Sequence, residues 1–221
     1  MGLEQLGGAK KWEGIPMKTA IENLGRQSAL ENPSPQDFCI EGPISAENLQ
    51  ALVSTFPFEV GITEQDGRLI LSAGVPGFAH HPDDSESYER HVRSKVSFHT
   101  HPVFDGTVYD SPSFGDLVIS QRRARYGVSG PELIAHPRGL TVFRAPDENG
   151  LIGEDIDDFC EKEGVERFTF ADDKPSRDRI AAASRKFAEV SGSIVAEARW
   201  DEPDKIEQIL GLFRHAQKQE Q

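Results

Sequence analysis

The most regular pattern of apolar and polar positions lies between residues 45 and 73. Ser45 is typical of a helix N-cap, and apolar residues follow it at helical spacing: Leu49, Leu52 and Val53. Apolar and polar residues then alternate from Phe56 to Ile62, which predicts a strand, and Asp66-Gly67 predicts a hairpin turn. The apolar run 68–73 is the returning strand, so this region predicts a helix followed by a β-hairpin.

Shorter patterns predict the elements that follow. They are a charged helix at 84–93, a strand at 95–101, a loop at 102–112, a helix from Ser113, and strands at 132–135 and 140–144. Two amphipathic helices come last, with the apolar stripes Ile180, Ala183, Phe187 and Val190, then Ile206, Ile209, Leu210 and Phe213. This order predicts an α/β (α+β) domain at 44–145, after a loosely ordered N-terminal arm (1–43) and before an acidic linker with a C-terminal helical extension (146–221).

The net charge of the chain excludes some classes of binding partner. The chain has 37 acidic and 24 basic residues, a net charge of −13, and such a surface repels nucleic acids and anionic membranes. No stretch approaches the roughly 20 apolar residues of a membrane span, and the first residues lack the apolar core of a signal peptide. Cys39 and Cys160 lie far apart without metal-type spacing, so we expect free thiols in a reducing compartment and a cytoplasmic protein.

The segment 97–116 contains the candidate chemistry. His99 and His101 stand two apart in a predicted strand, so their side chains point to the same face and can bind one metal ion. Asp116 offers an oxygen ligand a short way along the chain. Two histidines and one carboxylate leave a coordination position for water, which is typical of a catalytic zinc site.

Simpler interpretations exist for several of these residues. Ser113-x-x-Asp116 is also a capping box at the start of a helix. Asp105 and Asp110, in the loop before it, are alternative carboxylate ligands. We expect His91 to lie on the surface, because it belongs to a charged helix.

The order of these residues resembles the JAMM (MPN+) metalloprotease family. The matching residues are Glu59, then His99 and His101 in His-Thr-His-Pro, then Ser113 and Asp116. The resemblance covers about residues 45–145 and implies an MPN domain, a twisted and mostly antiparallel central sheet flanked by helices, with one zinc ion per chain at one end. The loop 102–112, eleven residues long, exceeds the family's usual length.

The resemblance implies a zinc-dependent hydrolase of an amide or isopeptide bond. Zinc and Glu59 would activate the water, with Glu64 the second candidate for the base, and Ser113 would donate to the oxyanion. The implied substrate is a ubiquitin-like protein or a peptide. Alternative interpretations are a RadC-like protein, a peptidase or amidase for a small substrate, and a non-catalytic interaction module.

Overall fold

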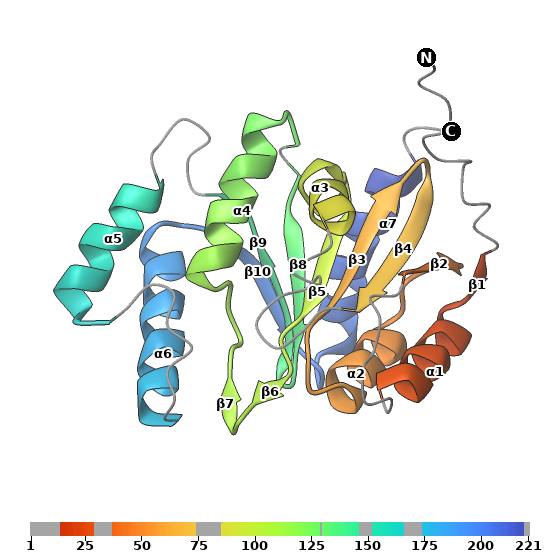
Figure 1. The fold of residues 1–221 in the computed structure, drawn as a ribbon, viewed down its shortest axis with the longest axis horizontal. Coiled ribbons are helices and arrows are strands. Elements are labelled where there is room, and N and C mark those ends of the chain that lie inside the picture. The colour runs from red at the N-terminus through yellow and green to blue at the C-terminus, as the bar shows by residue number, and fades with distance from the viewer. Residues whose placement is uncertain are drawn as a thin grey trace, which may run out of the picture.

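The architecture was obtained as a computed structural model that describes residues 14–28, 37–73, 85–128, 130–145, 152–165 and 174–218. Within these residues a sheet of eight strands has the order β1-β2-β4-β3-β5-β8-β9-β10 (Figure 1). Its strands are β1 (Ile15–Pro16), β2 (Asp37–Glu41), β3 (Val60–Gln65), β4 (Arg68–Ala73), β5 (Ser97–Thr100), β8 (Glu132–His136), β9 (Gly139–Phe143) and β10 (Ile194–Arg199). The pairs β1–β2 and β5–β8 are parallel and the others antiparallel, so the expected mostly antiparallel central sheet is confirmed.

Helices cover both faces of this sheet. They are α1 (Met17–Ser28), α2 (Ala46–Thr55), α3 (Ser85–Arg93), α4 (Phe114–Arg125), α5 (Ile152–Glu163), α6 (Lys174–Val190) and α7 (Pro203–Lys218). Side chains alternate across the sheet, so Leu133 packs in a core with α1, α2 and α7, whereas its neighbour Ile134 packs with α4, α5 and α6. Phe98 lies on the Leu133 face, its ring 4.8 Å from that of Phe213. The neighbouring His99 therefore points to the face that α4–α6 cover.

Local signals placed several elements correctly. The Ser45 side chain accepts a hydrogen bond from the Asn48 backbone and caps α2. Asp66 and Gly67 both have positive φ values, 53° and 74°, and Gln65 pairs with Arg68 across them. This two-residue turn with two left-handed residues matches the right-handed twist of the strands, as a hairpin turn requires.

The N-terminal segment 1–43 and the C-terminal segment 146–221, which were expected to be an arm and an extension, supply strands to the same sheet. Strand β2 pairs with β4, and β10 pairs with β9. Ala198 of β10 approaches Gly139 so closely that a Cβ there would overlap the Ala198 carbonyl oxygen. The described parts of 1–43 and 146–221 thus pack on the same core as 44–145, because that core's sheet offers edges that β2 and β10 complete.

Three smaller expectations concern the cysteines, the loop and the membrane. Cys39 and Cys160 are buried free thiols, as predicted. The loop at 102–112 contains a short hairpin of β6 (Val103–Phe104) and β7 (Thr107–Val108). None of the described helices is long and apolar enough to cross a membrane.

Candidate metal centre

Three side chains converge where β5 ends. The two Nε2 atoms of His99 and His101 lie 3.1 Å apart. The Asp116 carboxylate faces both rings, with Oδ1 3.3 Å from His99 Nε2 and Oδ2 3.3 Å from His101 Nε2. The imidazoles are buried, and the Asp116 side chain is 16% exposed. His99, His101 and Asp116 thus form a group that could hold a metal ion.

The spacing of the two imidazole nitrogens suits a small tetrahedral cation. Two ligands that each lie about 2.0–2.1 Å from zinc are about 3.3 Å apart in a tetrahedron. The two imidazole nitrogens, 3.1 Å apart, are close to that value. Each of them lies 3.3 Å from a different Asp116 oxygen, and ligand atoms taken one from each residue lie within 4.8 Å of one another. Two imidazole nitrogens and one carboxylate oxygen are also donors that zinc accepts, and they leave room for an exchangeable ligand.

Ordinary secondary structure sets this geometry. Strand β5 and its continuation place His99 and His101 on one face. Asp116 is the third residue of α4, where the predicted capping box is present: Ser113 N donates to Asp116 Oδ2 at 2.7 Å, and Asp116 N donates to Ser113 Oγ at 3.1 Å. The cap turns the carboxylate towards the histidines, so the structural and the metal-binding interpretations of Asp116 are compatible.

A backbone carbonyl determines the tautomer of His101. Its Nδ1 lies 3.2 Å from the carbonyl oxygen of Tyr109. Because a carbonyl only accepts, Nδ1 is the donor, and the lone pair of a neutral ring is then on Nε2, facing Asp116. Such an outer hydrogen bond is the usual way in which a metal-binding histidine is oriented. Sequence reasoning missed this contact because the acceptor is main chain and has no residue signature.

The histidines and Asp116 change one another's pKa values. Burial alone would lower the pKa of His99, but Asp116, together with Glu59 and Glu132, outweighs burial and raises that pKa to about 9. Burial in turn works to raise the pKa of Asp116, yet His99 and His101 hold it well below its ordinary value. The metal-free site therefore contains an imidazolium–carboxylate pair, which a divalent cation would replace.

Glu59 lies directly before β3, beside the two histidines. Gly61 of β3 pairs with His99, so the same register, continued outward, brings Glu59 opposite His101. The Thr100 hydroxyl fixes this end of the strand by accepting a 2.9 Å hydrogen bond from Val60 N. Burial raises the pKa of Glu59 to about 7, although His101 and His99 lower it.

The other candidate carboxylates have different partners. Glu64 is half-buried, and its carboxylate accepts a 2.6 Å hydrogen bond from Gly67 N in the hairpin turn. Asp105 has a φ of 44° in the β6–β7 turn. Asp110 binds Arg138, with Oδ2 2.5 Å from Nη1. None of these three belongs to the described group that could hold a metal ion.

His91 is buried, which corrects the expectation that it lies on the surface. The helical pattern showed the charged positions of α3 but not the buried polar cluster beneath it. There His91 Nε2 lies 3.9 Å from Glu132 Oε2, and Arg123 Nε lies 3.4 Å from Glu132 Oε1. Glu132 also adds to the negative field that raises the pKa of His99. No local motif predicted the pair of Arg123, on α4, and Glu132, on β8, which are both fully buried.

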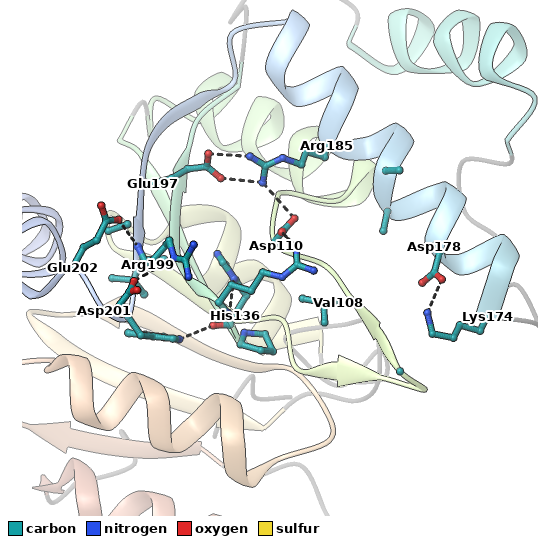
Figure 2. A pocket seen from close by; sticks show the side chains of 18 residues that line it. Val108, Asp110, His136, Lys174, Asp178, Arg185, Glu197, Arg199, Asp201 and Glu202 are labelled. Atoms are coloured by element: carbon teal, nitrogen blue, oxygen red, sulfur yellow. Dashed lines mark hydrogen bonds and ion pairs between the residues drawn. The ribbon is translucent and has the colours of Figure 1, made fainter.

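A cavity of about 1230 Å³ lies beside the candidate metal centre, between the β6–β7 loop, the β8–β9 turn, α6 and β10 (Figure 2). Asp110 and His136 line it, but the three candidate ligands do not. Its charged lining is largely paired; Figure 2 shows Arg185 between Glu197 and Asp110, and Lys174 beside Asp178. Burial and the nearby His101 lower the pKa of His136 to about 4, so this histidine is neutral at pH 7.

Comparison with known proteins gives no match: no family, no curated sequence and no solved structure is significantly similar to this chain.

Proposed function

We propose that this protein is a metal-dependent hydrolase of amide or isopeptide bonds, of the JAMM type, with zinc held by His99, His101 and Asp116. The observation that carries the proposal is the convergence of these three side chains at 3.1–3.3 Å beside Glu59, whose pKa lies near 7. A structural role alone does not require two buried imidazoles with their Nε2 atoms turned to one carboxylate.

The ion, when bound, supplies a Lewis acid that polarises a carbonyl and makes water more acidic. Glu59 is the proton carrier: its carboxylate takes a proton from the attacking water and passes it to the leaving amine. In the metal-free protein burial raises the pKa of Glu59 to about 7, and this opposes the lowering by a bound cation, so the carboxylate remains a better base than an exposed one.

Ser113 has a second role in this proposal. Its Oγ accepts a hydrogen bond from Asp116 N, so the hydroxyl proton is still available to donate. We assign that donor to the oxyanion that forms on the substrate carbonyl. The substrate that the family resemblance supports is a ubiquitin-like protein or peptide joined through its C-terminal carboxyl group.

Zinc analysis together with a substrate panel tests this function. The purified full chain should contain about one zinc, and it should cleave a member of a panel of ubiquitin-like fusions and isopeptide conjugates. A chelator should abolish cleavage, and His99→Ala or His101→Ala should remove the metal. Zinc content close to wild type in both variants would place the metal elsewhere, and a zinc-loaded protein inactive on the whole panel would argue for a non-catalytic module.

A further inference from the structure

Helix α6 packs alongside the loop that joins His101 to Ser113. Four of its residues contact this loop, in two pairs that lie about two turns apart on one face. The contacts are Thr107 Oγ1 to Asp178 Oδ1 at 2.9 Å, Arg177 Nη2 to the Asp105 carbonyl at 3.4 Å, Ser184 Oγ to the Pro112 carbonyl at 2.5 Å, and Arg185 Nη1 to Asp110 Oδ1 at 3.3 Å. A helix more than 60 residues away in the sequence therefore supports the hairpin turn of the loop and its end next to Ser113.

The strongest of these supports is a group that we call the Asp110 clamp: Asp110, Arg138, Arg185 and Glu197. Arg185 binds both Glu197 oxygens at 3.0 Å, which fixes its planar guanidinium (Figure 2). Its Nη1 and Arg138 Nη1 then hold one Asp110 oxygen each. Burial would raise the pKa of Asp110, but these two arginines lower it, so the clamp is an ionic one at neutral pH.

The clamp also fixes the main chain next to the candidate metal centre. The Thr141 hydroxyl donates to the Asp110 carbonyl at 2.8 Å, so both the side chain and the backbone of Asp110 are held. Tyr109, one residue earlier, supplies the carbonyl that accepts from His101 Nδ1. A displacement of Asp110 would move that carbonyl and release the His101 ring.

We propose that Asp110 and Arg185 are positioning residues for the metal centre: through the Tyr109 carbonyl they hold His101 in the tautomer and orientation that present Nε2 to the ion. This inference rests on the proposed metal site. Neither residue belongs to the described group that could hold the ion. Their effect should therefore appear in metal binding and in the state of the His101 ring.

The test compares Arg185→Gln with Arg179→Gln in the full-length chain. Arg179 is a matched control, because it lies on the same helix, is exposed, and donates to Ser176 within α6. Zinc affinity is measured by competition with a chromophoric chelator, and cobalt(II) substitution gives the ligand-field spectrum. Loss of an outer-shell partner commonly costs 10–100-fold in metal affinity. We expect about a tenfold loss for Arg185→Gln, a changed cobalt spectrum, partial rescue by Arg185→Lys, and no change for Arg179→Gln.

The outcomes separate the two proposals. If Arg185→Gln binds zinc as wild type does and keeps the cobalt spectrum, the clamp has no positioning role, although the metal site stands. If wild type binds no zinc, the proposed function fails, and nitrogen-15 NMR of metal-free protein then decides the clamp. Wild type should show His101 protonated on Nδ1 and Arg185→Gln a mixture of tautomers; the same tautomer in both would overturn the inference. If Arg185→Gln does not fold, Asp110→Asn, which keeps the shape of the side chain, takes its place in each measurement.

Discussion

Substituting Glu59 by glutamine is the sharpest test of the proposed chemistry. Glutamine keeps the size of the side chain and removes its capacity to take a proton. Glu59 does not belong to the group that could hold the metal, so the variant should retain about one zinc. A carboxylate with a pKa near 7 is mainly ionised at pH 8, and a bound divalent cation can only lower that pKa further. At pH 8 the wild-type base is therefore in its active form.

The expected loss follows from the role of the residue. General-base catalysis is typically worth 10²–10⁴ in rate, or about 3–5 kcal/mol of transition-state stabilisation. Because Glu59 would also return the proton to the leaving amine, we expect its loss to lower the rate by a factor near the upper end of this range. The assay is kcat/KM on a fluorogenic isopeptide or fusion substrate that wild type cleaves, with zinc content measured on the same sample.

Glu64→Gln is the control for this experiment. Glu64 is half-buried at the hairpin turn, and its carboxylate accepts a hydrogen bond from Gly67 N, which a glutamine oxygen can also accept. Its kcat/KM should stay within about twofold of wild type, as expected for a surface substitution. The reasoning is refuted if Glu59→Gln keeps kcat/KM within tenfold of wild type, or if Glu64→Gln abolishes cleavage instead.

The stability of the metal-free protein checks the burial of Glu59 independently of catalysis. Folding raises the pKa of Glu59 from 4.5 to about 7, so the folded protein binds this proton more tightly than the unfolded chain does. Its contribution to the free energy of unfolding is complete below pH 4.5 and is lost as the pH rises through 7. Glutamine does not titrate, so Glu59→Gln should not lose this stability. The difference between its denaturation midpoint and that of wild type should therefore shift in favour of the variant as the pH rises from 4.5 towards 8.

Two further predictions concern Ser113 and His99. Ser113→Ala should keep zinc, lose on the order of 10²–10³ in kcat and lose only about 1 kcal/mol of stability; a shifted melting curve with full activity would mean that Ser113 is only a helix cap. Because a metal ligand must be deprotonated and the pKa of metal-free His99 is about 9, zinc binding at pH 7 should release its proton. Affinity should then rise about tenfold per pH unit up to pH 9, and calorimetry in buffers of different ionisation enthalpy should detect the proton; its absence in wild type would contradict the His99–Asp116 pairing.

Sequence reasoning succeeded where cause and effect lie close together in the chain. The capping box of Ser113 and Asp116 spans four residues, and the same-face placement of His99 and His101 spans three. The hairpin turn at Asp66-Gly67 is equally local. In each case the backbone geometry follows from a short pattern, so the candidate ligands could be named before the structure was seen.

The contacts that depend on distant partners could not be predicted. Strand β10 alternates in exposure, but two of its three less exposed residues are alanines and the exposed Val195 is apolar, so its sequence gives only a weak strand signal. Its place in the sheet depends on β9 and on Gly139. Arg185 is an ordinary charged helix residue in the sequence, and only the fold brings it to Asp110, 75 residues earlier.

The length of the loop explains why the candidate centre needs this distant support. Eleven residues separate His101 from Ser113, and each ordered residue costs about 1–2 kcal/mol of backbone entropy. The β6–β7 hairpin orders part of the loop, but it has only two strands of two residues each, and an isolated two-stranded hairpin is marginally stable at best. Contacts from α6, together with Thr141 and Arg138, offset the remaining cost at Asp110 and Pro112, the residues nearest the Tyr109 carbonyl and the α4 cap. The segment 97–116 thus contains every candidate metal ligand, yet the geometry that makes those ligands converge is shared with α6 and β10 in the last third of the chain.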